Sequence, residues 1–171
     1  LVFWLLALLS YSQQDAAWST SGSGSNGMVA NWGGRVGAWL AGGSYFLLGV
    51  SVWWCALAAV RAWMAALARW MRGGAPAPGE APAWQRRVVF WGGLALLLGA
   101  STALEWSRLY RLEHWLPGSA GGVLGAVVGP LALQWFGTTG SALLGFVAVV
   151  LCVTLVLDFS WGRLAEALGA R

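Results

Sequence analysis

The chain has 171 residues, of which 58% are hydrophobic and only 9% are charged, whereas charged residues make up about a quarter of an ordinary soluble domain. This composition excludes a soluble monomer and predicts an all-α protein with several transmembrane helices. The net charge is +4, and all ten basic residues are arginine. Without lysine, the chain has neither the lysine of a phosphate-binding loop nor a Schiff-base lysine. The arginines are scattered between apolar runs and do not form the basic stripe typical of nucleic-acid binding.

A bilayer core requires about 20 apolar residues per helix, and the longest uncharged stretches of the sequence reach that length. The predicted spans are about 1–10, 40–62, 88–106 and 140–159, the first of them cut at its start. They leave loops at 11–39 and 107–139 on one side of the membrane and a loop at 67–87 on the other. We therefore expect residues 1–171 to form a single membrane domain.

The uncharged stretch before the last span is too interrupted to supply a further crossing. Pro130 lies in the middle of the apolar segment 121–136, and the Gly-Thr-Thr-Gly sequence at 137–140 is a turn cluster that isolates the last span. The segment 121–136 has about the length of a short re-entrant or interfacial helix. Whether it re-enters the membrane or lies on its surface is left open by the sequence.

The arginines predict the orientation of the spans, because short cytoplasmic loops carry an excess of basic residues. Four spans place seven arginines inside (Arg61, Arg69, Arg72, Arg86, Arg87, Arg163 and Arg171) and three outside (Arg35, Arg108 and Arg111). A fifth crossing by 121–136 would make the numbers five and five and remove the bias. We therefore expect both termini to be cytoplasmic.

Few residues could support catalysis or metal binding. His114 is the only histidine, and a metal site typically needs three or four ligands, so we expect no catalytic, cofactor or metal site in this segment. Glu105, Arg108, Arg111 and Glu113 are more notable, because i,i+3 spacing places Glu105, Arg108 and Arg111 on one helical face. Such a group forms either a solvated helix end with weak ion pairs or a patch for docking a partner.

Three glycines are spaced for close helix packing. Gly121, Gly125 and Gly129 recur every four residues, which places them on one face of a helix and lets another backbone approach closely. We expect this face to be buried against a neighbouring helix.

The loops carry a family resemblance that covers essentially the whole chain. The motifs are Tyr-Ser-x-x-Asp-x-x-Trp-Ser at 11–19, Asn-Trp-Gly-Gly-x-x-Gly-Ala-Trp at 31–39, Leu-Pro-x-x-x-Gly-Gly-x-x-Gly at 116–125 and Ser-Trp at 160–161. Together they resemble the four-helix membrane domain of the FtsK/SpoIIIE DNA translocases. Gln13 and Ala16 stand where that family tends to have proline, and Gly42 stands where an aspartate often follows Gly-Ala-Trp. The residues singled out for partner contact or structure are Asp15, Trp18, Asn31, Gly34, Gly37 and Trp39, beside Glu105, Arg108, Arg111 and Glu113.

The resemblance implies a membrane anchor that targets the division septum and links chromosome segregation to cell division. It implies a bacterial inner-membrane location, contacts with other cell-division membrane proteins and a homo-oligomer, a hexamer in this family. The ATP- and Mg-dependent motor that moves DNA would lie beyond residue 171. The alternative is a small transporter or channel subunit, which would need an ionisable residue in the middle of a span. An integral membrane enzyme would need converging histidines, carboxylates or a nucleophile.

Overall fold

The described elements of the protein are all helices. The computed structural model describes residues 1–17, 29–73, 82–157 and 169. Its elements are α1 (Val2–Leu9), α2 (Gly34–Leu48), η1 (Gly49–Ser51), α3 (Val52–Met71), α4 (Ala83–Arg108), η2 (Tyr110–Trp115) and α5 (Gly122–Leu157). The expected all-α architecture is therefore confirmed. Trp18, Arg163, Arg171 and the linker residues 74–81 lie outside the described residues.

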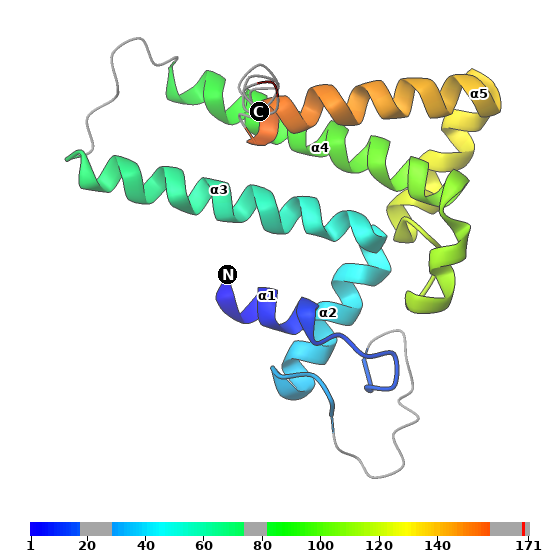
Figure 1. Cartoon of the computed structure of the whole chain (residues 1–171), viewed down its shortest axis with the longest axis horizontal. Helices are drawn as coiled ribbons and strands as arrows, with labels where there is room; N and C mark the ends of the chain where they lie inside the picture. Colours follow the sequence, from blue (N-terminus) through cyan, green and yellow to red (C-terminus); the bar gives the residue numbers. More distant parts are fainter. Residues whose placement is uncertain (18–28, 74–81, 158–168, 170–171) are drawn as a thin grey trace.

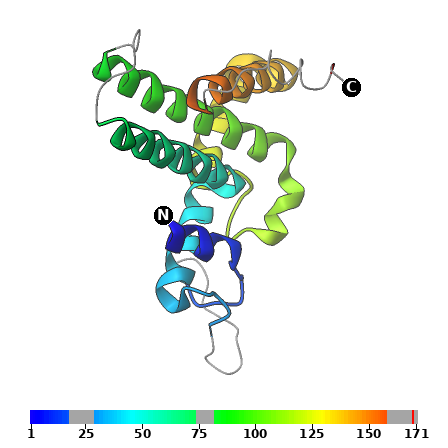
Figure 2. The same cartoon turned by 60° about the vertical axis from the view of Figure 1, so that its left-hand side comes forward.

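Most of the helices run along one common direction, which gives the molecule two ends (Figure 1). α1, α3, α4 and the last part of α5 follow this direction in alternating senses, whereas α2 and the first part of α5 run across it. We call the end that carries residues 10–17 and 109–121 the loop end. The opposite end, where α3 finishes and α4 begins, we call the arginine end. Both views place α3 between the pair α1 and α2 and the pair α4 and α5 (Figure 2).

Three helical stretches are long and apolar enough to cross a membrane, namely Gly34–Met71, Ala83–Arg108 and Gly122–Leu157. The expected polytopic membrane protein is therefore confirmed. α1 has eight residues and runs toward the loop end (Figure 1). α4 contains the whole of the predicted span 88–106, and the second part of α5 contains the described residues of the span 140–159.

The first of these stretches is divided. The range 40–62, expected as one span, is split between α2 and α3 by the short 3₁₀ turn η1. Gly49 has a φ of 59°, a left-handed conformation that favours glycine. The helix that runs along the common direction is thus α3, which begins only at Val52 and continues past the predicted end of the span to Met71. The predicted loop 67–87 accordingly includes the last turn of α3 and the first turn of α4.

α5 is bent at the place that the sequence indicates. Gly137 has non-helical angles inside it, with φ 65° and ψ −178°, and the chain changes direction there (Figure 1). The helix runs through Pro130 without a second break in its dihedral angles, although proline was expected to interrupt it. A helix in a membrane protein tolerates proline where neighbouring helices and local adjustment satisfy the freed carbonyl. The segment 121–136 is therefore a helical arm that joins the last span at Gly137.

Two apolar clusters hold the helices together. One cluster joins α1, α2, the start of α3 and the segment after η2 and consists of Ala7, Leu8, Ala41, Tyr45, Val52 and Leu116. The other joins the middle of α3 to α4 and α5 and consists of Ala58, Leu94, Leu97, Cys152 and Val156. The buried residues of α3 all lie in its first half, so the half toward the arginine end is much less tightly packed.

The glycine ladder lies against α4. A Cβ added at Gly121 or Gly125 would lie 2.2 or 2.6 Å from the carbonyl oxygen of Thr102, and one added at Gly129 would lie 2.5 Å from the indole of Trp106. These distances are far below van der Waals contact, so only glycine lets the arm of α5 approach α4 this closely.

Replacing Gly125 by leucine should therefore separate α5 from α4. We expect Gly125→Leu to lower the free energy of unfolding in detergent by about 1–3 kcal/mol, the usual cost of overpacking. The matched control is Gly92→Leu in α4, where an added Cβ has nothing within 4 Å. Denaturant titration followed by circular dichroism measures both variants. Equal stability of Gly125→Leu and the unmodified chain would contradict the close packing.

Candidate functional site: the hydrogen-bonded loop end

Asp15 connects the two ends of the first loop by hydrogen bonds. Its side chain is 4% exposed, and its two carboxylate oxygens accept hydrogen bonds from the backbone N–H of Ala30 at 2.7 Å and of Asn31 at 2.9 Å. A buried carboxylate is stable only when it is paired in this way. Asp15 thus fixes the segment after α1 against the segment before α2.

Asn31 joins α1 to the start of α2. Its amide nitrogen donates to the carbonyls of Ala7 at 2.8 Å and Ser10 at 3.3 Å, and its side-chain oxygen accepts from the N–H of Gly33 at 2.9 Å. An asparagine oxygen in this position satisfies one of the N–H groups that a helix start leaves without a partner. The side chain is 4% exposed, so its role is to hold the two helices and not to contact a partner.

Two glycines of the 31–39 motif have structural explanations. A Cβ at Gly37 would lie 2.2 Å from the side-chain oxygen of Asn31. Gly34 has a φ of 61°, a conformation that other residues rarely adopt. The spacing of asparagine and glycine in this motif therefore follows from local packing.

Two residues at which the sequence departs from the family pattern also have a structural explanation. Gln13 donates its side-chain amide to the carbonyls of His114 at 3.0 Å and Leu116 at 3.1 Å, so it joins the first loop to the segment around η2. A proline at this position could not make these bonds. A Cβ at Gly42 would lie 2.8 Å from the Cβ of Ala17, so an aspartate there would force the first loop to shift.

Glu105 is the centre of a second polar cluster. It accepts hydrogen bonds from the N–H of Val50 at 2.9 Å and from the hydroxyl of Ser51. The Ser51 hydroxyl also lies 2.6 Å from the hydroxyl of Ser101. Glu105 is only 6% exposed, which corrects our grouping of this residue with a charged surface at the end of α4. The acid turns inward because the helix break at η1 presents donors that need an acceptor.

Three backbone segments meet around this carboxylate. A Cβ at Gly49 would lie 2.6 Å from the backbone nitrogen of Gly121 and 2.7 Å from a carboxylate oxygen of Glu105. A Cβ at Gly122 would lie 2.6 Å from the carbonyl carbon of Leu47. The end of α2, the end of α4 and the start of α5 are therefore in direct backbone contact.

The remaining charged residues of this end lie at its surface. Arg108 is exposed and donates a hydrogen bond to the carbonyl of Thr138, just after the bend in α5. Arg111 is exposed, and Glu113 is exposed and accepts from the N–H of Ala120 at 3.4 Å. The expected i,i+3 stack of Glu105 and Arg108 does not form, because each side chain bonds to a different segment.

Aromatic side chains of the first loop and of α2 differ in exposure. Trp32 is 73% and Trp39 is 57% exposed. Tyr11 instead stacks on Tyr45 with ring centroids 4.8 Å apart, and burial, with smaller contributions from Tyr45 and Asp15, raises the pKa of its phenol to about 12. The two tryptophans, together with Arg111 and Glu113, are available for contact with another molecule.

The buried polar residues of the loop end hold helices together, and its exposed residues are better suited to docking a partner than to catalysis. Among the described residues, no group of three or more histidine, cysteine, aspartate or glutamate side chains could hold a metal ion. The carboxylate oxygens of Asp15 and Glu105 are buried and accept hydrogen bonds from backbone and serine donors, so both side chains already have structural partners. Sequence reasoning missed Ser51 and Ser101. The only feature of the sequence that could have indicated these two serines is that they are small hydroxyl residues inside apolar runs.

Removing the Glu105 carboxylate should weaken the junction of α2, α3 and α4. We expect Glu105→Leu to lower the free energy of unfolding by about 3 kcal/mol, because it removes the acceptor of the Val50 N–H and leaves the buried Ser51 hydroxyl with only Ser101 as a partner. Glu113→Leu, at an exposed acid of the same end, is the control and should cost less than about 1 kcal/mol. Thermal unfolding in detergent micelles compares the two. Equal losses would show that Glu105 has no special structural role.

Comparison with known proteins identifies the chain's relatives. A sequence profile for the "4TM region of DNA translocase FtsK/SpoIIIE" matches residues 1–169. A protein named "DNA translocase FtsK 2" from Ralstonia nicotianae is 37% identical over 170 residues, which are 99% of this chain and 21% of the relative. "DNA translocase FtsK" from Pseudomonas syringae pv. syringae is 32% identical over 171 residues, 98% of this chain and 20% of the relative. "DNA translocase FtsK 1" from Neisseria meningitidis serogroup A is 32% identical over 165 residues, 94% of this chain and 19% of the relative. The chain thus spans about a fifth of these relatives, and no solved structure matches it.

Proposed function

Because the chain belongs to the family of the four-transmembrane region of the DNA translocases FtsK and SpoIIIE, we propose that it anchors an FtsK-like cell-division translocase in the membrane and brings it to the division septum. The single observation that supports this function is the match to the family profile over residues 1–169. Membrane-length helices and this family together indicate an inner-membrane protein. The segment is the non-enzymatic membrane region of such proteins, and the motor that uses ATP and moves DNA belongs to the rest of the parent.

The loop end offers the surface for partners in this proposal. Arg111 and Glu113 are exposed there and Trp39 is exposed on α2, and aromatic anchors with arginine are the residue types enriched in protein interfaces. The buried Asp15, Asn31 and Glu105 keep this surface in place. Other cell-division membrane proteins and further copies of the chain, six in the family's assembled motor, are the partners that we propose.

The rival function, a small transporter or channel subunit, has less support. Glu105 is the one acid in the described part of α4, but it lies near the end of the helix, and its carboxylate is occupied by hydrogen bonds. Neither of the two described cavities is lined by it. A residue that carries ions or protons would be expected to face a water-filled path.

The proposed topology places both termini and the loop between α3 and α4 in the cytoplasm. The test is cysteine labelling of Pro78→Cys in a Cys55→Ala, Cys152→Ala background. A membrane-impermeant maleimide should label Pro78→Cys only after the membrane is opened, and Ser21→Cys in the same background should react in intact spheroplasts. Labelling of position 78 in intact spheroplasts would overturn the orientation.

To test the septal role, the chain is fused to a fluorescent protein, expressed without any motor domain, and located in dividing cells by fluorescence microscopy. It should concentrate at the division septum, and the pair Trp39→Ala, Arg111→Ala should reduce septal enrichment severalfold while membrane insertion is kept. The matched control pair is Trp70→Ala, Arg72→Ala, which changes the same residue types at the arginine end. Uniform membrane fluorescence of the unmodified chain in cells with an assembled division ring would refute the proposal and favour the transporter alternative.

A further inference from the structure

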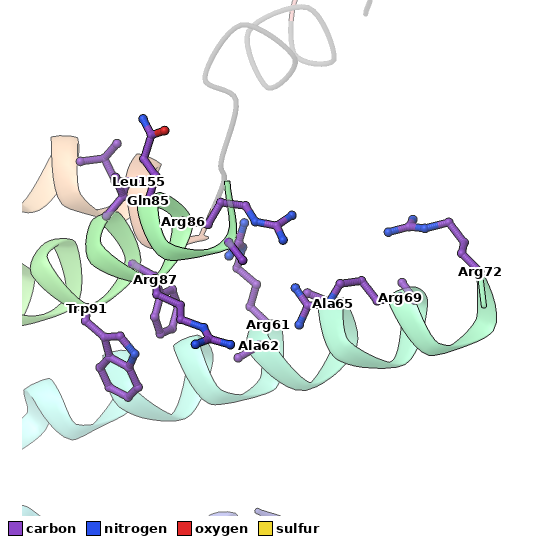
Figure 3. Close-up of a pocket in the computed structure, with 14 residues that line it drawn as sticks. Arg61, Ala62, Ala65, Arg69, Arg72, Gln85, Arg86, Arg87, Trp91 and Leu155 are labelled. Carbon is purple, nitrogen blue, oxygen red and sulfur yellow. The ribbon is translucent and has the colours of Figure 1, made fainter. Parts of the chain in front are cut away.

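The two ends of α4 mark the two headgroup levels of the membrane. Arg87 lies near its start, where α4 shares a cleft with arginines of α3 (Figure 3), and Arg108 is its last residue. Residues 88–104 between them carry no charge. The helix from Arg87 to Arg108 rises about 32 Å, which is close to the thickness of the hydrocarbon core. Arg108 therefore lies at the headgroup level of the loop end, and α4 follows the membrane normal.

The last part of α5 runs antiparallel to α4 along the same direction. A Cβ at Gly93 would lie 3.2 Å from Cγ2 of Val156, and one at Gly145 would lie 2.9 Å from Cγ of Leu104. The same number of residues separates Gly93 from Leu104 in α4 as separates Gly145 from Val156 in α5. The two helices therefore stay side by side through the membrane.

The arm of α5, residues 121–136, does not follow that direction. Just after it, the carbonyl of Thr138 accepts a hydrogen bond from Arg108, and at its start a Cβ on Gly121 or Gly125 would meet the carbonyl oxygen of Thr102. From Thr102 to Arg108, α4 rises only about 9 Å, whereas the arm itself is about 22 Å long. The arm therefore lies closer to the plane of the membrane than to its normal (Figure 1).

The face of the arm that is turned away from α4 is apolar. Two residues turn a helix by about 200°, so positions two residues after the glycines of the ladder lie on the opposite face. These positions are all exposed, and we call them the outer row: Val123, Val127, Leu131 and Trp135. Residues 116–157 include no charged residue. Soluble proteins rarely expose a contiguous apolar surface of this kind to water.

The apolar face of the arm continues the lipid-facing surface of the last span. Phe136 of the arm and Leu144 of the last span line one groove of about 260 Å³ over α4, and none of the described residues that line it is charged. Beyond the groove, Leu143, Phe146 and Leu151 are exposed along the last span. This span belongs to a stretch long enough to cross a membrane, so lipid covers its exposed side chains. The groove extends the same apolar surface to the arm.

We propose that the arm lies in the plane of the bilayer, in the leaflet at the loop end, and that lipid covers its outer row. Helices that lie in the interface are buried by about 5–10 Å, which agrees with the rise of about 9 Å from Thr102 to Arg108. Trp135 lies near the bend, at the shallow end of the arm, where an indole ring prefers the headgroup level. The inference depends on the membrane-spanning helices and is independent of the septal role.

The test measures the depth of spin labels on the purified chain in phosphatidylcholine vesicles. Val123→Cys and Leu131→Cys are made singly in the Cys55→Ala, Cys152→Ala background and labelled. Electron paramagnetic resonance power saturation then compares collisions with oxygen and with a water-soluble nickel chelate. Both labels should collide mainly with oxygen, and their depths should differ by about 5 Å. A difference near about 12 Å, the rise of eight residues along the membrane normal, would overturn the proposal. Val127→Cys gives a third reading between the two.

The matched controls are Leu143→Cys and Val147→Cys, two exposed positions of the last span. They are only four residues apart, but their depths should differ by about 6 Å, because this span follows the normal. Arg111→Cys, at an exposed position of the loop end, should collide mainly with the nickel chelate. Frequent nickel collisions at the arm labels would place the outer row in water. Weak collisions with both reagents would show that a second copy or another protein covers it, and either result contradicts the proposal.

Discussion

The fold depends on one buried carboxylate at a break in a helix. Between α2 and α3 the chain changes direction, and the first N–H groups after such a break have no partner within the helix. Glu105 supplies the acceptor from 55 residues away, bonding to the N–H of Val50 and to the hydroxyl of Ser51. Because Glu105 belongs to α4, the same carboxylate that completes the break also fixes α4 against α3.

Glycine makes this junction compact. Gly49, Gly121 and Gly122 all have positive φ, and at each of them an added Cβ would collide with the backbone of another segment. The carboxylate and the glycines act together, because the hydrogen bonds require close approach and only glycine permits it. Arg108 extends the junction to the bend of α5 through the carbonyl of Thr138. The loop end is thus a continuous set of polar contacts between four helices.

The sequence predicts the parts of this fold that depend on local composition. The helical class, the bend at Gly137 and the spacing of Gly121, Gly125 and Gly129 can be read from residue types and distances along the chain. The break at η1 cannot, because residues 36–60 contain no proline and no charge and the acceptor that stabilises the break is distant in sequence. For the same reason Glu105 resembles a surface acid in the sequence. Asn31 and Gly37 are recognisable as a motif, but their direct contact is visible only in the structure.

Because α3 is packed only in its first half, a small rotation there moves its other end much further. Its buried residues are Val52, Ala56 and Ala58, so the helix is held at one end and projects from there toward Arg72. At 1.5 Å per residue, 20 residues extend about 30 Å, and a rotation of about 5° at Val52 would move the far tip by about 2.6 Å. The end of α3 near Met71 is thus the part of this helix that packing restrains least.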